Sequence, residues 1–313
     1  MPQHMAARSK DHMTKQEEIR KLKQEKDAVI LAHYYVAPEV QEIADYVGDS
    51  FYLSKIAAKL PNRTLVFCGV SFMGESGKLL SPEKSVLMPD ASADCPMAHM
   101  VSKEEVEEAR KNYEDLAVVC YINSTAQIKA WSDVCVTSAN AVAIVRNLPN
   151  KNILFIPDKN LGRFVAEQEP EKHVVLVKGY CPVHEHMKAQ EIQELKEAHK
   201  EAPVLAHPEC NEAVLSLADY IGSTSGIIKY AAESQKKEFI IATEEGVLYE
   251  LKRQNPGKQF YFPKTTPVCG DMKKVTLDKV IHVLNTGEND ASVPEKITAP
   301  AKETLRRMLE LAN

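Results

Sequence analysis

An internal threefold repeat is the feature that most constrains how this chain can fold. Three segments of 21 residues align without gaps, and they begin at Ile30, Val118 and Val204, which are 88 and 86 residues apart. Each segment contains an apolar run, a polar group, a helical stretch, a second short apolar run and a hydroxyl residue. A period of this kind indicates that one structural unit occurs three times in succession.

The pattern inside each repeat predicts a parallel sheet. Apolar strand, helix and apolar strand is the order of a βαβ unit. Two more strand candidates separated by a helical stretch follow each repeat: 64–68 and 85–88, 152–156 and 173–177, 238–242 and 259–262. We therefore expect an α/β fold of three pseudo-equivalent three-layer α/β domains, with parallel sheets around a central pseudo-threefold axis.

The repeat also predicts the domain organisation. Thr14 and Glu17 have the spacing of a capping box, so a helix should begin there and belong to the first domain. The first residues carry no motif, and we expect them to be disordered. The expected ranges are a disordered 1–13, a first domain 14–112, a second domain 113–198, a third domain 199–300 and a C-terminal helix 301–313.

Composition narrows the classes of partner and compartment. The chain has 313 residues, 44% of them hydrophobic, which is enough for a large core divided among domains. Its net charge of -5 gives no reason to expect nucleic acid or an anionic membrane as a partner. No apolar stretch approaches the ~18 residues of a membrane span. The N-terminus has no visible export signal, and with seven cysteines we expect a reducing, cytoplasmic compartment.

Polar residues occupy matching positions at the predicted strand ends. Ligands of parallel α/β sheets bind at the carboxyl ends of the strands. Taken singly, each of these residues would most often pack or cap a helix, but their threefold occurrence favours one shared site. The hydroxyl column precedes predicted helices and suits a carboxylate or a phosphate. The three columns are His33, Tyr121 and His207; Tyr35, Asn123 and Glu209; Ser50, Ser138 and Thr224. A further aligned column, Asp45, Asp133 and Asp219, is assigned a structural role at a turn or cap.

One cysteine follows each repeat at nearly the same distance. Cys95, Cys181 and Cys269 lie 45, 43 and 45 residues after the hydroxyl residue of their repeat. The remaining four lie in or beside apolar runs and are assigned to packing: Cys68, Cys120, Cys135 and Cys210. Three thiols that are equivalent by the repeat could converge on the pseudo-threefold axis, which predicts a metal centre.

Two metal centres fit three convergent thiolates. A structural zinc ion would need a fourth protein ligand, which His184 or His186 could supply. A [4Fe–4S] cluster held by three cysteines leaves one iron without a protein ligand, and that iron can act as a Lewis acid. The spacing favours the cluster but leaves zinc open. No CxxC pair occurs, which argues against a zinc ribbon or a thioredoxin-type site.

Several longer motifs resemble those of one enzyme family. They are "ILAHYY" with "IADYVGDS", "DCPMA", "YINSTAQIKAWSDVCVTSANA", "PDKNLG", "GYCPVH", "AHPEC" with "ADYIGSTSG", "ATEEG" and "PVCGDMKK". In this order they resemble the quinolinate synthases, the iron–sulfur enzymes of de novo NAD biosynthesis, over residues 28–290. The resemblance implies three domains around a central [4Fe–4S] cluster with Cys95, Cys181 and Cys269 as its ligands.

The resemblance also implies a reaction. Iminoaspartate and dihydroxyacetone phosphate would condense and lose phosphate and water to give quinolinate, with the cluster as a Lewis acid. The pathway implies an L-aspartate oxidase or dehydrogenase as the supplier of iminoaspartate. Tyr35 and Glu209 would be the acid/base pair, and His207 would orient or protonate an oxygen of the three-carbon fragment. Tyr121 and Asn123 would hydrogen-bond the intermediate.

The remaining implied roles concern anion binding and orientation. His184 lies three residues after Cys181 and is a further candidate for orienting that part of the site. The expected holders of substrate carboxylates or phosphate are His33, Ser50, Ser138, Ser223 and Thr224.

Two other classes of function share the three-cysteine pattern. One is a different trilobed iron–sulfur enzyme, either an isoprenoid diphosphate reductase or a diphthamide-type radical enzyme, on architecture alone. The other is a non-enzymatic scaffold or binding module stabilised by zinc. Such a scaffold should be colourless, and His207 and Glu209 should be replaceable in it.

Overall fold

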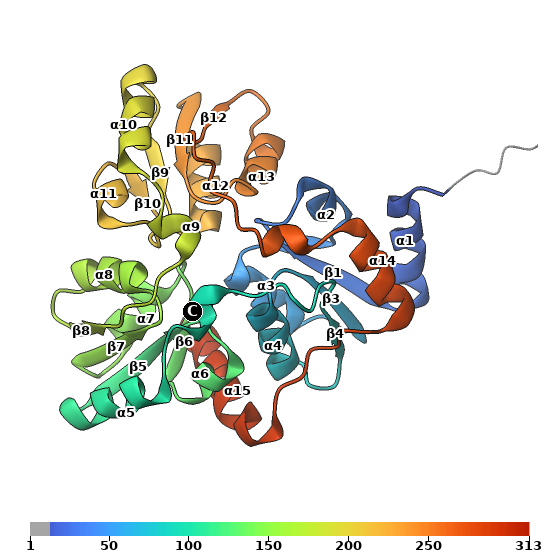
Figure 1. Cartoon of the computed structure of the whole chain (residues 1–313), viewed down its shortest axis with the longest axis horizontal. Coiled ribbons are helices and arrows are strands. Elements are labelled where there is room, and N and C mark those ends of the chain that lie inside the picture. The colour runs from blue at the N-terminus through green and yellow to red at the C-terminus, as the bar shows by residue number, and fades with distance from the viewer. Residues whose placement is uncertain (1–12, 313) are drawn as a thin grey trace, which may run out of the picture.

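Three parallel sheets arranged around a centre make up this protein. The computed structural model describes residues 13–312, and its three lobes are separate in Figure 1. Each lobe has a four-stranded sheet, and all pairings within the sheets are parallel. In each sheet the first strand lies between the second and the third, and the fourth is at the edge. The predicted α/β fold of three similar domains is therefore confirmed.

The first lobe has the sheet order β2-β1-β3-β4. The predicted capping box is present at its N-terminal helix, where the Thr14 hydroxyl accepts from the Glu17 amide and the Glu17 side chain accepts from the Thr14 amide. Its elements are α1 (Lys15–Glu25), β1 (Ala28–His33), α2 (Pro38–Ile43), β2 (Tyr46–Gly48), α3 (Ser50–Ala57), β3 (Thr64–Cys68), α4 (Ser71–Leu80), β4 (Ser85–Leu87) and the 3-10 turn η1 (Pro96–His99).

The second lobe repeats that order as β6-β5-β7-β8. Its elements are α5 (Lys103–Asn112), β5 (Leu116–Tyr121), α6 (Ala126–Ala130), β6 (Val134–Val136), α7 (Ala141–Asn147), β7 (Asn152–Ile156), α8 (Lys159–Gln168), β8 (His173–Leu176) and α9 (Pro182–Glu185).

The third lobe has the order β10-β9-β11-β12. Alternate strand residues face opposite sides, so Val204 joins one apolar layer and Leu205 the other. Its elements are α10 (Ala189–Ala198), β9 (Val204–Ala206), α11 (Glu212–Leu215), β10 (Tyr220–Ile221), α12 (Thr224–Glu233), β11 (Glu238–Ala242), α13 (Val247–Gln254) and β12 (Gln259–Tyr261).

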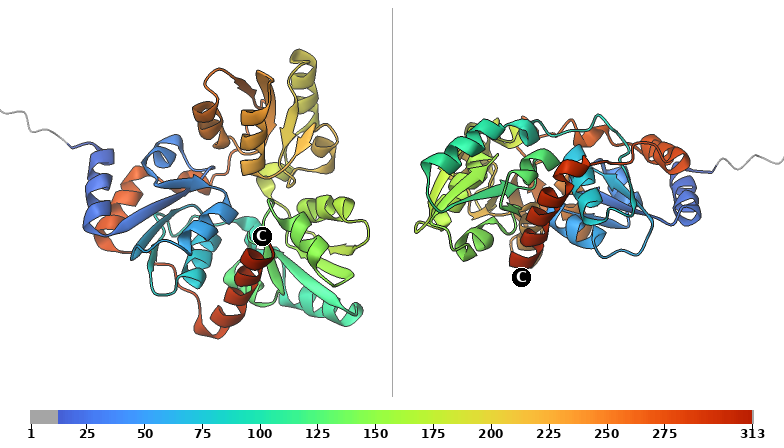
Figure 2. Two further views of the ribbon diagram at one scale, coloured as in Figure 1. Left: turned by 180° about the vertical axis from the view of Figure 1, so that it is seen from behind. Right: turned by 90° about the horizontal axis from the view of Figure 1, so that it is seen from below.

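The end of the chain returns to the first two lobes. After η2 (Met272–Lys274), helix α14 (Leu277–Thr286) packs against α1, and α15 (Glu295–Leu311) packs against α4, α6 and β6. Figure 2 shows α15 crossing the junction between the first two lobes. Their buried residues form one continuous apolar cluster, which includes Leu305 and Met308 of α15. The third lobe has two apolar clusters of its own.

The expected domain ranges remain a prediction, because nothing independent of the fold tests them. The structure adds that the C-terminal helix begins at Glu295 and that the segment 272–311 packs on the first two lobes. The prediction of disorder for 1–13 concerns, apart from Met13, residues outside the described part of the chain.

The helices inside the three repeats are shorter than a typical crossover helix. Helices α2, α6 and α11 have 6, 5 and 4 residues. The strands that follow them, β2, β6 and β10, have only 3, 3 and 2 residues. Each pairs with the first strand of its sheet. A three-residue strand spans ~10 Å, and six helical residues span ~9 Å, so a longer helix is not needed for the return.

The aligned aspartates join the two strands of each repeat. Each aspartate donates its backbone N–H to the carbonyl of the repeat's first residue, at 2.9 Å in all three cases. The N–H of that first residue donates to the aspartate carboxylate at 2.8, 2.7 and 2.8 Å. The three pairs are Asp45 with Ile30, Asp133 with Val118 and Asp219 with Val204. These hydrogen bonds give the aspartates the structural role that the sequence predicted.

We predict that Asp219→Ala destabilises the third lobe by about 1–3 kcal/mol, because the buried Val204 amide loses its carboxylate acceptor. The midpoint of urea-induced unfolding measures the loss. Asp278→Ala is the control, since Asp278 has a side chain that is 70% exposed and pairs only at the surface with Lys15. An Asp219 variant that is no less stable than the control contradicts the prediction.

Candidate active site at the junction of the three lobes

A cavity of about 290 Å³ lies where the carboxyl ends of the three sheets meet. All nine residues of the three aligned columns line it, although their repeats are separated by more than 80 residues. They are His33, Tyr35, Ser50, Tyr121, Asn123, Ser138, His207, Glu209 and Thr224. The three matched cysteines, Cys95, Cys181 and Cys269, line the same cavity. The cavity therefore brings together what the repeat predicted.

Ser223 is the one proposed site residue that is absent from this lining. Its hydroxyl accepts from the Gly226 amide at 3.1 Å and so caps α12, which leaves the neighbouring Thr224 hydroxyl to the cavity. In the first lobe Asp49 caps α3 in the same way and leaves Ser50 to the cavity. In these two lobes the residue before the column caps the helix, whereas in the second lobe α7 begins after Asn140, which makes no side-chain cap bond.

Two histidines are held in equivalent ways. The Nδ1 atom of His33 accepts from the Tyr35 amide at 3.1 Å, and Nδ1 of His207 accepts from the Glu209 amide at 3.3 Å. The proton therefore resides on Nε2, and His207 Nε2–H donates to the Ser138 hydroxyl at 3.2 Å. Burial lowers the pKa of His33 to about 3 and that of His207 to about 4. Both rings are neutral hydrogen-bond donors at pH 7.

Glu209 is the carboxylate at the centre of the site. Burial alone would raise its pKa, but the His207 and His184 rings and hydrogen bonds from His184 and Tyr121 outweigh burial and lower the pKa below its usual value. One oxygen, Oε2, lies 2.8 Å from His184 Nδ1, and the other, Oε1, has no hydrogen-bond partner among the described residues. The site therefore holds an ionised carboxylate with one oxygen available.

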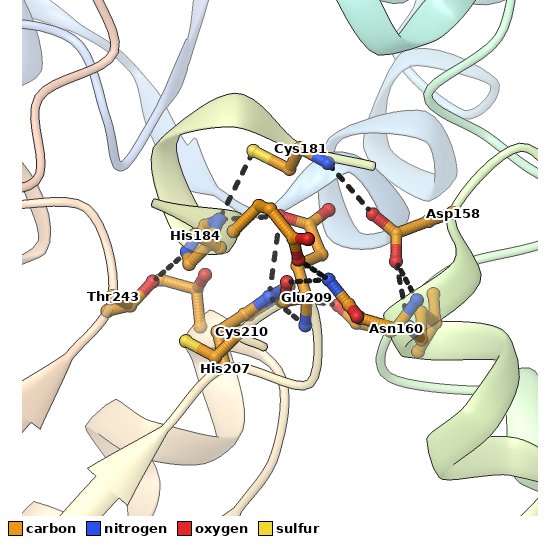
Figure 3. A network of polar contacts seen from close by, with 12 residues as sticks. Asp158, Asn160, Cys181, His184, His207, Glu209, Cys210 and Thr243 are labelled. Atoms are coloured by element: carbon orange, nitrogen blue, oxygen red, sulfur yellow. Dashed lines mark hydrogen bonds and ion pairs between the residues drawn. The ribbon is translucent and has the colours of Figure 1, made fainter. Parts of the chain in front are cut away.

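A chain of hydrogen bonds joins Tyr35 to Glu209. The Tyr35 hydroxyl lies 2.8 Å from the Thr243 hydroxyl, which lies 3.0 Å from His184 Nε2. Figure 3 shows His184 between Thr243, Cys181 and Glu209. Burial raises the pKa of Tyr35 well above its usual value, so Tyr35 carries its proton at neutral pH. The chain can pass a proton between the two ends of the site.

Two residues of the site, Thr243 in this network and Asp49 elsewhere in the cavity wall, were not found from the sequence. Thr243 directly follows β11, and the corresponding residues after β3 and β7 are Gly69 and Pro157, so the repeat gives no signal there. Asp49 lines the cavity and accepts from the Ser225 hydroxyl at 2.6 Å. An acidic residue directly before a predicted helix was the sequence signal that could have identified Asp49.

Carboxylates hold the backbone of all three cysteines. The distances from the cysteine N to the carboxylate oxygen are 2.8, 3.1 and 3.0 Å for Cys95 with Asp94, Cys181 with Asp158 and Cys269 with Glu244. Asp158 and Glu244 are fully buried at matching positions, two residues after β7 and β11. The same position in the first lobe is Val70, so sequence comparison of the repeats did not reveal this pair.

The thiols themselves are poorly suited to ionise alone. Burial raises the pKa of each, and nearby Glu209 raises it further for Cys95 and Cys181, as Glu244 does for Cys269. Cys95 also senses the charge of Cys269, and Cys181 that of Cys95, so the three lie within electrostatic reach of each other. A positively charged metal centre between them would offset this repulsion.

The two histidines considered as zinc ligands differ in position. His184 is buried, and its Nδ1 lies 3.3 Å from Cys181 Sγ. His186 does not line the cavity and packs against the Tyr180 ring, with 6.0 Å between ring centroids.

Tyr121, buried in the cavity wall, has a pKa raised well above its usual value by burial and by Glu209.

Known proteins with similar sequences share one description. Residues 17–310 match the family described as "Quinolinate synthetase A protein". The chain is 53% identical over 295 residues to the quinolinate synthase of Clostridioides difficile, covering 94% of this chain and 97% of that protein. It is 53% identical over 294 residues to the quinolinate synthase of Caldicellulosiruptor bescii, with 94% and 97% covered. It is 49% identical over 296 residues to quinolinate synthase 2 of Methanosarcina acetivorans, with 95% of each covered.

The buried neutral state of His207 predicts a pH dependence of stability. As the pH falls below 6.5 the unfolded chain takes up a proton at His207, whereas the folded chain does so only near pH 4. The free energy of unfolding should therefore fall across this window, by on the order of 3 kcal/mol from this residue. His207→Gln should flatten the profile measured by denaturant unfolding. Equal slopes for His207→Gln and the parent protein would argue against a neutral His207.

Proposed function

Because this chain belongs to the quinolinate synthase family, we propose that its central cavity forms quinolinate with a [4Fe–4S] cluster as cofactor. The enzyme is a quinolinate synthase, and the relatives share about half of its residues over nearly the whole chain. The family assignment separates it from diphosphate reductases, radical enzymes and zinc scaffolds. The observation that carries the proposal is the meeting of three thiols and nine repeat-related polar residues on one cavity.

Cys95, Cys181 and Cys269 would hold the cluster. They are one thiol from each repeat unit, and a carboxylate holds the backbone of each: partly exposed Asp94 for Cys95, and buried Asp158 and Glu244 for the other two. When bound, a cluster with three protein ligands supplies an iron that can polarise a substrate oxygen or nitrogen as a Lewis acid. Burial raises the pKa of all three thiols, so the positive charge of a bound cluster would be needed to hold them together as thiolates.

The substrates proposed are iminoaspartate and dihydroxyacetone phosphate, which carry carboxylates and a phosphate. The neutral His33 and His207 rings would donate hydrogen bonds to substrate oxygens through Nε2–H. Asn123 adds an amide to the same wall. The hydroxyl column adds a donor from each lobe: Ser50, Ser138 and Thr224. Ser223 would act indirectly, because its hydroxyl caps the helix that positions Thr224.

Proton transfer would run between Glu209 and Tyr35. Glu209 is ionised and has an available oxygen, so it can take a proton from the three-carbon fragment during enolisation. Tyr35 keeps its proton and can give it to a departing hydroxyl. The chain through Thr243 and His184 would return the proton from Glu209 to Tyr35. Tyr121, from the second repeat, would hydrogen-bond the intermediate.

The supply of substrate and the compartment are also proposals. Iminoaspartate is the product of oxidising L-aspartate at its amino group, so an L-aspartate oxidase or dehydrogenase would precede this enzyme. All seven cysteines are free thiols, which supports a reducing cytoplasm. No helix in the described part of the chain has both the length and the apolar character needed to cross a membrane.

Cys95→Ala should abolish a complete cluster, whereas Cys68→Ala, at a buried packing position, should retain it. After anaerobic reconstitution, iron and sulfide analysis with visible absorbance measures the cluster. Quinolinate formed from iminoaspartate and dihydroxyacetone phosphate measures the activity. A parent protein that stays colourless and iron-free, or that holds a cluster and makes no quinolinate, would overturn the proposal.

Glu209→Gln should keep the cluster and lower turnover about 10²–10⁴-fold, the usual contribution of a general base. The glutamine keeps the shape of the side chain but cannot take the proton. Glu233→Gln, on the exposed surface of α12, is the matched control and should retain full turnover. Turnover of Glu209→Gln equal to that of the control removes Glu209 from the acid/base role.

A further inference from the structure

We propose that the cluster-free form of this protein binds one Zn²⁺ ion through Cys181, His184 and Glu209. Since Cys181 is also a proposed cluster ligand, zinc and the cluster would be mutually exclusive. The site differs from a zinc ion on the three cysteines, because it uses one thiol, one imidazole and one carboxylate. The inference concerns metal binding before cluster assembly and does not depend on the reaction proposed above.

The three ligand atoms are already gathered. His184 Nδ1 lies 3.3 Å from Cys181 Sγ and 2.8 Å from Glu209 Oε2. All three ligand atoms lie within 4.8 Å of one another. Tetrahedral zinc with bonds of about 2.0–2.3 Å places its ligand atoms roughly 3.3–3.8 Å apart. Shifts of side chains alone, without a change of fold, would complete the geometry.

Local structure supplies the spacing. Cys181 is the residue that precedes α9, and His184 lies three residues later in the first turn of that helix. Residues three apart on a helix lie on the same face, so the thiol and the imidazole point to one place. Glu209 reaches the same place from the loop after β9 of the third lobe.

An unpartnered carboxylate oxygen independently points to a cation here. Glu209 is 3% exposed, and its Oε1 has no hydrogen-bond partner among the described residues. Among the described side chains, the only basic groups within 4 Å of its oxygens are the His184 and His207 rings, and no lysine or arginine neutralises it. The Nδ1 atom of His207 accepts from the Glu209 amide, so that ring offers no positive charge. A buried carboxylate without a full countercharge is costly. A divalent cation bound to this carboxylate would supply the missing countercharge.

The surroundings already orient the imidazole for metal binding. His184 Nε2 lies 3.0 Å from the Thr243 hydroxyl, which can either donate or accept a hydrogen bond. When zinc replaces the proton on Nδ1, the proton moves to Nε2. The Nε2–H group then donates a hydrogen bond to the Thr243 hydroxyl. A ligand histidine held through its second nitrogen by a hydroxyl or carboxylate is the usual arrangement at zinc. The fourth zinc position would face the cavity and hold water.

The test uses the full chain, prepared anaerobically without a cluster and titrated with Zn²⁺ by calorimetry. We expect one zinc ion per chain, and Cys181→Ser, His184→Gln and Glu209→Gln should each weaken binding by at least about 10-fold. The matched controls are Cys95→Ser and Cys269→Ser, which lose proposed cluster ligands but should bind zinc with unchanged affinity. Circular dichroism of each variant confirms that it is folded.

A measurement on the parent protein avoids dependence on the variants. Co²⁺ bound in place of zinc should show the charge-transfer absorbance of one thiolate and not of three. Loss of zinc binding in Cys95→Ser or Cys269→Ser, or a three-thiolate spectrum, would assign the ion to the three-cysteine centre and overturn the proposal. Full affinity in Glu209→Gln would overturn it as well.

Competition gives a further readout that is separate from quinolinate formation. Zinc bound before reconstitution should slow the uptake of iron, and a chelator should restore it. In Glu209→Gln, which keeps the cysteines, this inhibition should be weaker. Unimpeded iron uptake by the zinc-loaded parent protein contradicts a shared Cys181. A protein that takes up iron normally but binds no zinc leaves the proposed function intact and removes only this inference.

Discussion

Each sheet of this protein ends in polar side chains that the described residues of its own lobe leave short of hydrogen-bond partners. The arrangement of the three lobes depends on how these side chains find partners. Buried polar groups need partners, and here those partners come from the neighbouring lobes. The Tyr35 hydroxyl of the first lobe bonds Thr224 and Thr243 of the third, and His207 of the third bonds Ser138 of the second. The cavity is the space enclosed by these contacts, so assembling the lobes and forming the site are the same event.

The three lobes are not joined alike. The first two share an apolar cluster sealed by α15, whereas the third keeps separate clusters, one of which Tyr34 of the first lobe packs against. Hydrogen bonds also join the third lobe to the other two. Several of those bonds reach backbone carbonyls: Gln41 Nε2 donates to Gly246, Asn160 Nδ2 to Glu209, and Asn211 Nδ2 to Glu185. Gly246 approaches Tyr35 so closely that a Cβ atom would lie 2.7 Å from the Tyr35 Cα. That contact requires glycine and brings the third lobe directly against the first.

Charge at the centre is arranged by backbone and histidine groups more than by lysine or arginine. Asp158 accepts amide hydrogens from Cys181 and from the start of α8. Glu244 accepts from Cys269 and pairs with Lys273 at 2.9 Å. Among the described side chains, Glu209 is matched by two imidazoles and the Tyr121 hydroxyl, with no lysine or arginine. This graded neutralisation leaves Glu209 as the carboxylate with the most unsatisfied charge, where both proton transfer and cation binding are favoured.

The sequence by itself determined the repeat, the strands, the nine column residues and the three cysteines, because these depend on local periodicity and recur at matching positions. Only the tertiary structure decided the partners of those residues. Thr243, Asp158 and Glu244 lie where the three repeats differ, so alignment of the repeats was silent about them. The Tyr35–Thr243 bond joins residues 208 positions apart, and no local pattern encodes such a contact. The protonation of His207 was likewise decided by burial, and that of Glu209 by the side chains gathered around it, and both exist only once the three lobes close.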